Sequence, residues 1–448
     1  MKRRNPAAAA AALCLIFGQP AFAANGETVL HTFTGLADGG ASYSGVTMDR
    51  HGNIFGTTSV GGLTGCYTNG CGTVFELIRD GKRWTFATIY TFQGSDGANP
   101  WAAPIADAHG NLFGTTQYGG DSACGVAYEL SPTGGGQWSQ KVLHSFHSSR
   151  GNRDGCMPHA TLTFGPDGNL YGTTTAGGGG NTVFGPICSY GCGTVFELSH
   201  KRDGSWKERV LHAFPPQTGT TDGLLPYYGV VFDSKGNLWG MTARGGTPQC
   251  GGGGTPGCGI VYKLSPAGDG AWNETIGFVF LNSKTGTNPF GGLAIDGADN
   301  LYGPVAGSPG LGAIFQMRPQ ADGSLSESLI HVFRGCGHEC HDDGAFPNGS
   351  FVFDAEGSLY GTTYDGGGAG TICKPIGCGT LFKLTPDGQG GWNETLLHRF
   401  TGEADGYQPN PDRLAVDSKG HVFGTTPGGG SACPQYQVGC GVVFKIKR

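Results

Sequence analysis

The chain of 448 residues carries 28 Lys and Arg against 34 Asp and Glu, which gives a formal net charge of −6 at pH 7. Proteins that bind nucleic acid usually present clustered basic side chains to the phosphates, and this sequence has no such cluster, so we expect no nucleic-acid partner. The 86 Gly and 25 Pro recur at fixed places between apolar runs, which is typical of a folded all-β protein with many turns rather than of disorder.

The N-terminal residues predict a signal peptide. Residues 2–4 are basic, residues 7–17 form an apolar run, and Ala21-Phe22-Ala23 resembles a cleavage site. A membrane anchor is the alternative, but it needs about 20 apolar residues. We therefore expect residues 1–23 to be removed and residues 24–448 to form a single exported domain, periplasmic or secreted, without membrane insertion.

A unit of four strands fills the rest of the chain and occurs seven times, with a mean period of about 61 residues. Its most regular segment, in most copies an aliphatic residue followed by aromatic-Gly-Thr-Thr, lies within residues 53–58, 111–116, 169–174, 237–242, 300–305, 358–363 and 421–426. An apolar strand ending in Asp precedes this segment. A Gly-rich loop, a strand like Thr-Val-Phe-Glu-Leu and a strand ending in Leu-His-x-Phe follow it. Four short antiparallel strands make one propeller blade, so the sequence predicts a seven-bladed β-propeller. A β-helix, the alternative, has far shorter coils.

The two ends of the repeated region predict how the ring closes. Residues 28–33 have the pattern of a fourth strand that no earlier strand accompanies, and residues 441–447 that of a third strand with none after it. Pairing the two would complete the seventh blade and remove two open sheet edges. We therefore expect the N-terminal strand to close the ring.

The repeated Leu-Tyr-Gly-Thr-Thr, the Gly-Gly and variable loop after it, and the Gly-Thr-Val-Phe-Glu-Leu strand resemble the GloVer tandem-repeat family of exported bacterial proteins. The resemblance covers essentially the whole chain after the signal peptide. It implies this repeat fold and export, and it implies no particular chemistry because the family has no assigned activity.

Fourteen cysteines remain after the predicted cleavage, an even number in a compartment that would be oxidising. Twelve of them form close pairs, namely Cys66 with Cys71, Cys188 with Cys192, Cys250 with Cys258, Cys336 with Cys340, Cys373 with Cys378 and Cys433 with Cys440. In five pairs the second cysteine directly precedes the Gly of the third strand, so a disulfide would fix the long loop at that point. Cys124 and Cys156 are left over. We expect them to form a bridge because their loops leave the ring on the same side.

Long connections of two classes should emerge on one face of the ring: the loops closed by cysteine pairs and the Asp-Gly-x-x-Pro segments between blades. Long loops on a rigid scaffold usually carry binding, so we expect this face to be functional. Its candidate ligand-binding residues are Trp101, Tyr227, Tyr228, Asp96, Asp154, Asp222, Asp343 and Asp405. The carboxylates would form a ring near the pore mouth that could hold Ca²⁺ or sugar hydroxyls. The alternative is that Asp and Gly only build the turn.

Other features of the repeat leave structural and functional readings open. The Leu-His-x-Phe histidines occur in five copies, too many for a catalytic residue, and we expect them to pack at strand edges. The Thr-Thr pair either lines a polar mouth or packs across strands. Unit five lacks the cysteines, the Asp-Gly and the Thr-Thr, and its short loop at residues 307–312 could open a groove.

One segment is dense in metal-ligating side chains. Residues 336–341 read Cys-Gly-His-Glu-Cys-His. An oxidised cysteine pair cannot bind zinc as thiolate, so we expect a disulfide between Cys336 and Cys340, no metal and no cofactor.

The sequence favours a monomeric binding propeller that recognises a glycan, a peptide or an envelope partner. A lyase or glycosidase is one alternative. It would use two carboxylates about 5–9.5 Å apart, with Glu339, Asp342 and Asp343 as first candidates. A structural envelope protein is the other. No catalytic residue can be assigned, and a broad aromatic patch on the loop face would favour glycan binding.

Overall fold

The computed structural model describes residues 26–447 except 63–65, 67–68, 148–153, 180–187, 189–190, 216–220, 248–249, 251–256, 282–283, 308, 335–342, 369–372, 374–375, 410–411, 431–432 and 434–438. The predicted signal peptide lies outside the described residues. The named elements of the described part are all β-strands, and this part contains no helix long and apolar enough to cross a membrane.

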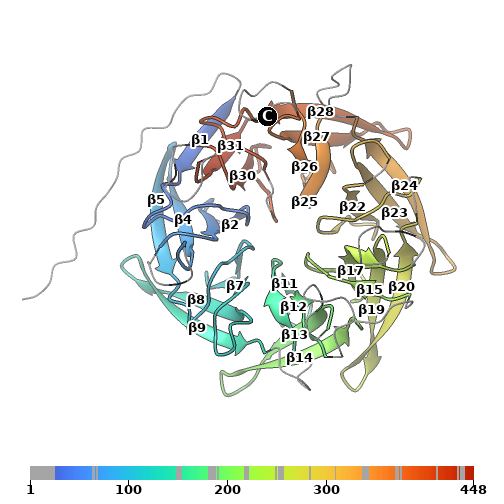
Figure 1. Ribbon diagram of the computed structural model, residues 1–448, viewed down its shortest axis with the longest axis horizontal. Coiled ribbons are helices and arrows are strands. Elements are labelled where there is room, and N and C mark those ends of the chain that lie inside the picture. The colour runs from blue at the N-terminus through green and yellow to red at the C-terminus, as the bar shows by residue number, and fades with distance from the viewer. Residues whose placement is uncertain are drawn as a thin grey trace, which may run out of the picture.

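Seven antiparallel blades surround a central axis, as the repeat predicts (Figure 1). We number the blades along the chain and give their strands from the centre outward. Blade 1 contains β2 (Thr47–Met48), β3 (Ile54–Thr58), β4 (Thr73–Asp80) and β5 (Arg83–Thr91), and blade 2 contains β6 (Ile105–Ala106), β7 (Leu112–Thr116), β8 (Val126–Gly134) and β9 (Gln137–Ser145). Blade 3 contains β10 (Cys156–Pro158) and β11 (Thr163–Phe164), both paired with β12 (Leu170–Ala176), then β13 (Thr194–His200) and β14 (Trp206–Ala213).

The remaining blades repeat this order. Blade 4 contains β16 (Val231–Phe232), β17 (Leu238–Thr242), β19 (Ile260–Gly268) and β20 (Ala271–Val279), with the small pair β15 (Gly223–Leu224) and β18 (Arg244–Gly245) beside it. Blade 5 contains β21 (Ala294–Ile295), β22 (Leu301–Val305), β23 (Ala313–Pro319) and β24 (Leu325–Val332), and blade 6 contains β25 (Ala345–Phe353), β26 (Leu359–Asp365), β27 (Thr380–Pro386) and β28 (Trp392–Arg399). Blade 7 contains β29 (Ala415–Val416), β30 (Val422–Thr426), β31 (Val442–Ile446) and β1 (Glu27–Thr32).

The N-terminal strand closes the ring, which confirms the sequence prediction. β1 pairs antiparallel with β31 from Glu27 opposite Ile446 to Thr32 opposite Val442, and the two strands lie side by side in Figure 1. Val29 and Phe33 are 5% and 0% exposed. The closing strand therefore contributes core side chains as well as an edge pairing.

The Gly in the middle of each second strand has a packing reason. A Cβ on Gly114 would lie 2.5 Å from the hydroxyl oxygen of Tyr128, and one on Gly424 would lie 2.6 Å from the ring of Phe444. In both cases the aromatic ring belongs to the third strand of the same blade. The second strands are buried on both faces between neighbouring blades, which is why their sequence shows no polar alternation.

The Thr-Thr pair is structural. Both Thr57 and Thr58 are 0% exposed. Thr57 Oγ1 donates to the carbonyl oxygen of Ala102 in the next blade at 3.2 Å, and Thr58 Oγ1 lies 2.8 Å from Thr73 Oγ1 across the sheet. The first Thr thus holds the inner segment of the following blade, and the second joins two strands of its own blade.

Six of the predicted disulfides are present: Cys66–Cys71, Cys124–Cys156, Cys188–Cys192, Cys250–Cys258, Cys373–Cys378 and Cys433–Cys440. The seventh differs from these six because the structure does not test it. Cys336 and Cys340 both lie outside the described residues, as do the other members of the 336–341 segment. The disulfide expected between Cys336 and Cys340 is therefore not confirmed and stays a prediction.

The Cys124–Cys156 disulfide spans 32 residues and joins blade 2 to blade 3. Because a longer closed loop restricts the unfolded chain more, we expect the double substitution of Cys124 and Cys156 by Ala to lower the free energy of unfolding by about 2–4 kcal/mol. The pair Cys188 and Cys192, separated by 4 residues, is the control and should lose less when treated in the same way. Denaturant unfolding of the oxidised proteins measures both losses. Equal losses would contradict the loop-length argument.

Candidate functional site: an aromatic arc around the channel

Five consecutive blades carry an aromatic residue at the same place in their inner segment, just before the innermost strand. These residues are Tyr43, Trp101, His159, Tyr227 and Phe290. In four of the blades the residue directly follows the Pro of the inter-blade segment. We call this set the aromatic arc.

The neighbouring rings of the aromatic arc touch one another. The ring centroids of Tyr43 and Trp101 lie 4.2 Å apart and are nearly parallel, and those of Trp101 and His159 lie 4.5 Å apart. The series continues from His159 to Tyr227 at 6.0 Å and from Tyr227 to Phe290 at 5.5 Å. None of the five side chains is fully buried, and Phe290 is 37% exposed. The arc is therefore a continuous, partly exposed aromatic surface.

Hydrogen bonds from threonine side chains to backbone carbonyls of the next blade hold the aromatic arc in place. The first Thr of the Thr-Thr pair donates to the carbonyl oxygen of the residue after the arc member, as Thr57 does to Ala102 at 3.2 Å and Thr115 to Ala160 at 3.3 Å. Thr173 donates in the same way to the carbonyl oxygen of Tyr228 at 3.0 Å. Because buried strand ends supply these donors, the rings stand on a rigid part of the fold.

Polar side chains from blades 6 and 7 complete the circle. The Tyr228 hydroxyl donates to Asn348 Oδ1 at 2.7 Å, and the Thr161 backbone N–H donates to Asp412 Oδ2 at 2.8 Å. These bonds join blades 4 and 6 and blades 3 and 7, so inner segments of blades that are not neighbours meet across the ring. Arg413, next to Asp412, has an exposed side chain.

The electrostatics make the aromatic arc uncharged at neutral pH. Burial lowers the pKa of His159 to about 4, so its imidazole is neutral at pH 7. Burial raises the pKa of Asp412 to about 6, against the hydrogen bonds from Thr161 and the charge of Arg413. The site thus offers flat apolar ring faces beside one carboxylate, one amide and one guanidinium.

The structure brings together some of the candidate residues that the sequence predicts and separates others. Trp101 and Tyr227 are members of the aromatic arc, and Tyr228 adjoins it with its ring centroid 5.9 Å from that of Phe290. Sequence reasoning did not identify Tyr43, His159 and Phe290 as members. Superposing the units that have a Pro would have found His159 and Phe290, because the residue after the Pro is aromatic in four consecutive copies. Tyr43 follows Ser42 and would not have been found in this way.

The repeated aspartates do not lie at the pore mouth as expected. Each lies beside a fourth, outermost strand, because the chain leaves that strand through Asp-Gly before it runs inward. Asp154 is paired with His144 at 2.8 Å, and Asp222 and Asp405 are paired with His212 and His398 at 3.2 Å. Asp96 accepts a hydrogen bond from Tyr90, and Asp343 lies 3.9 Å from His331. The repeated histidines therefore do more than pack at a strand edge: they contact these carboxylates.

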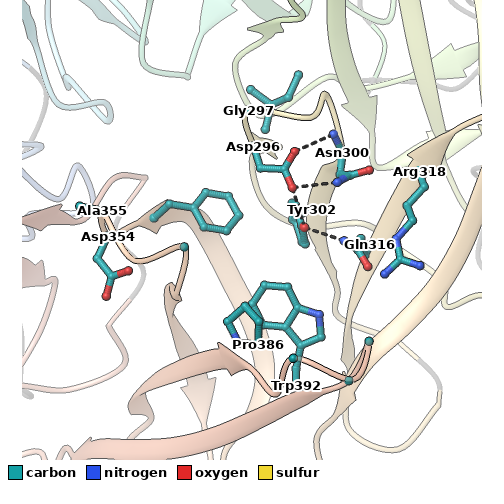
Figure 2. A pocket seen from close by; sticks show the side chains of 16 residues that line it. Asp296, Gly297, Asn300, Tyr302, Gln316, Arg318, Asp354, Ala355, Pro386 and Trp392 are labelled. Atoms are coloured by element: carbon teal, nitrogen blue, oxygen red, sulfur yellow. Dashed lines mark hydrogen bonds between the residues drawn. The ribbon is translucent and has the colours of Figure 1, made fainter.

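A cavity of about 650 Å³ lies between blades 5 and 6 (Figure 2). Its lining includes Gly297 in the β21–β22 turn and Gly388 in the β27–β28 turn, which places it on the face of the short turns. Asp296 Oδ2 accepts hydrogen bonds from Asn300 at 2.8 Å and from the Tyr302 hydroxyl at 2.9 Å. Gln316 Nε2 donates to the same hydroxyl at 2.6 Å.

The aromatic contact that lines this cavity recurs at other blade interfaces. Trp392 packs against Tyr302 of the preceding blade at 5.7 Å, as Trp272 packs against Tyr171 at 6.1 Å and Trp206 against Phe113 at 5.9 Å. Packing therefore explains its aromatic lining. The cavity adjoins unit five on the face opposite the loop at residues 307–312, where the sequence suggested a groove.

Comparisons with known proteins give a family and distant structural likenesses. The model of the Gloeobacter/Verrucomicrobia repeat matches residues 21–252 and 182–433. No curated protein matches the sequence. Among solved structures, PorZ, a surface component of the type-IX secretion system of Porphyromonas gingivalis, is 14% identical with a TM-score of 0.49 over 91% of this chain and 46% of that one. The chain thus spans about half the length of PorZ. The periplasmic gluconolactonase PpgL of Pseudomonas aeruginosa is 15% identical with a TM-score of 0.46 over 84% of this chain and 93% of that one.

Proposed function

The chain belongs to the Gloeobacter/Verrucomicrobia repeat family, and we propose that its propeller is an exported scaffold that binds a glycan through the aromatic arc. The observation that carries this proposal is the unbroken contact of five partly exposed rings from Tyr43 to Phe290. Ligand sites usually combine apolar and aromatic walls with a few placed polar groups. The C–H faces of a sugar suit the rings, and its hydroxyls suit the guanidinium of the exposed Arg413.

Export is part of this proposal. Six disulfides in one chain are typical of an oxidising compartment. Residues 1–23 would be the signal peptide and residues 24–448 the exported domain. The disulfides support export and do not distinguish the periplasm from the outside of the cell.

The aromatic arc favours binding over hydrolysis. A glycosidase would need a second carboxylate about 5–9.5 Å from the first. Among the described residues of the inner segments before each innermost strand, Asp412 is the only carboxylate. Glu339 and Asp342, which the sequence suggested for an enzyme, lie outside the described residues, and Asp343 lies at the outer strand. A peptide or an envelope protein as the ligand remains the second candidate, since exposed aromatic side chains also suit protein partners.

Glycan-array binding of the mature, oxidised protein tests the proposal. We expect retention of one glycan class without cleavage, and we expect Trp101→Ala to weaken that binding at least tenfold because it removes the central ring of the stack with Tyr43 and His159. The loss corresponds to about 1.4 kcal/mol.

The matched control is Trp392→Leu. Trp392 lines the cavity between blades 5 and 6, and blade 5 carries Leu325 at the corresponding position, so the fold accepts this residue. We expect the control to bind glycan as the unmodified protein does. Loss of binding in Trp392→Leu with retention in Trp101→Ala would move the site to the cavity. Release of a cleaved product would contradict the binding-only function.

A further inference from the structure

Three potential metal ligands meet at the interface between blade 6 and the closing strand of blade 7. Glu27 lies on β1, His398 on β28 and Asp405 in the segment that follows β28. His398 Nε2 lies 3.2 Å from Asp405 Oδ2 and 3.6 Å from Glu27 Oε2. One ligand atom from each residue lies within 4.8 Å of the other two, a spacing that allows a single ion to contact all three.

The Glu27 carboxylate gives an independent sign of a missing ligand. Its side chain is 0% exposed, and neither of its oxygens has a hydrogen-bond partner among the described residues. A buried carboxylate without a hydrogen-bond partner is unfavourable. A cation placed between the three residues would compensate for this burial, because Glu27 Oε2 points at His398.

We propose that Glu27, His398 and Asp405 bind one divalent transition-metal ion, for which Zn²⁺ is the best match. One imidazole nitrogen and two carboxylate oxygens are ligands that zinc accepts, and three protein ligands leave a fourth position for water. Ca²⁺ and Mg²⁺ take oxygen ligands and would not use His398.

The position of the site gives the ion a role in ring closure. Glu27 belongs to the N-terminal strand, whereas His398 and Asp405 belong to blade 6 and the segment after it. The closing strand already pairs with β31 of its own blade. An ion bound to all three residues would connect it to the neighbouring blade as well. Since such an ion binds the folded ring and not the unfolded chain, it would raise the stability of the ring.

The repeat supplies internal comparisons. The same three residue types meet at two other blade interfaces, as His144, Asp154 and Glu208 and as His212, Asp222 and Glu274. At the interface of blades 7 and 1, Phe86 takes the place of the glutamate and stacks on His31 with ring centroids 3.6 Å apart. That interface keeps the His–Asp pair, at 3.1 Å, and lacks the third ligand.

Zinc binding by the mature, oxidised protein tests the proposal. The protein is stripped with chelator, dialysed against Zn²⁺ alone, and assayed for bound metal and for melting temperature. We expect Glu27→Gln to bind one equivalent of Zn²⁺ fewer than the unmodified protein and to gain less stability from added zinc. The His398→Phe variant should lose the same equivalent, and Phe278 at the corresponding position of blade 4 shows that the strand accepts Phe.

The control is His31→Phe, which makes the same change at the interface where Phe86 replaces the glutamate. We expect this variant to bind as many zinc ions as the unmodified protein. The proposal is overturned if the unmodified protein binds no Zn²⁺ at micromolar concentration, or if both Glu27→Gln and His398→Phe keep its full zinc content. These outcomes do not depend on glycan binding.

Discussion

Deletion of residues 24–34 is expected to unfold the whole ring rather than to release a single strand. The deletion removes β1, which pairs with β31 along its length, and it removes the buried side chains of Val29 and Phe33. Burial of these two side chains alone contributes about 3–6 kcal/mol. That is comparable with the total stability of about 5–15 kcal/mol of many folded proteins.

The loss should spread because the closing strand contacts blades on both sides. His31 stacks on Phe86 of blade 1, and Glu27 lies beside His398 of blade 6. Without β1, blade 7 exposes the edge of β31 and loses contacts to both neighbours. We expect a large fall in melting temperature or insoluble protein, measured by thermal melting followed by circular dichroism.

Addition of a peptide of residues 24–34 to the truncated protein is the control for this deletion. The peptide should bind at the β31 edge and restore much of the lost stability, because it restores the same backbone pairing. A truncated protein that melts at the temperature of the unmodified protein would show that the seven-bladed ring does not depend on its closing strand.

The sequence predicts the fold well because the pattern of one blade occurs in it seven times. The Gly of Leu-aromatic-Gly-Thr-Thr is required under the aromatic ring of the third strand, as at Gly114 beneath Tyr128. Such contacts lie within one unit, so they recur at a fixed spacing in the sequence. Ring closure can be predicted from the same pattern. Residues 28–33 have the pattern of a fourth strand with no strands of its unit before it, and residues 441–447 are a third strand with no fourth strand after it.

The candidate sites are harder to predict because their contacts cross from one unit to another. His144 of blade 2 contacts Asp154 after that blade and meets Glu208 of blade 3, and no spacing within one unit reveals this group. The contact of Tyr228 with Asn348 crosses from blade 4 to blade 6. Trp101 and Tyr227 could be proposed from residue type alone, whereas the continuity of the aromatic arc depends on the curvature of the ring.

The ring is expected to lose stability as the pH rises from 6.5 to 8.5. Burial raises the pKa of Glu327 to about 7; burial and the nearby Asp343 raise that of Glu394 to about 7, against Arg399. Burial, with a smaller effect of Asp154, raises the pKa of Glu208 to about 8, and burial also raises that of Glu274. The folded state therefore holds protons that the unfolded chain has already released, so the free energy of unfolding falls until the pH passes the folded pKa values.

The expected fall between pH 6.5 and 8.5 is about 2 kcal/mol for Glu208. Glu327 and Glu394 are partly exposed, so solvent screening reduces their contributions to less than about 1 kcal/mol each. Below pH 6.5, buried histidines also change the stability of the ring. Burial lowers the pKa of His159 and His331, so these two destabilise the ring only as the pH falls below their unfolded value of about 6.5. The Asp222 hydrogen bond and the charge of Glu274 raise the pKa of His212 against burial, so its contribution falls with rising pH, as those of the glutamates do.

Denaturant unfolding at pH 6.5 and 8.5, with chelator present, measures the fall. We expect Glu208→Gln to be more stable than the unmodified protein at pH 8.5 and to lose about 2 kcal/mol less over this range. Substitution of the exposed Glu356 by Gln is the control and should leave the pH dependence unchanged. If the stability of the unmodified protein did not fall over this range, the buried glutamates would be ionised in the folded ring already at pH 6.5. A cation that resists the chelator and lies between the blades in place of the proton would then explain the charge, and metal analysis of the same chelator-treated sample would show whether it is present.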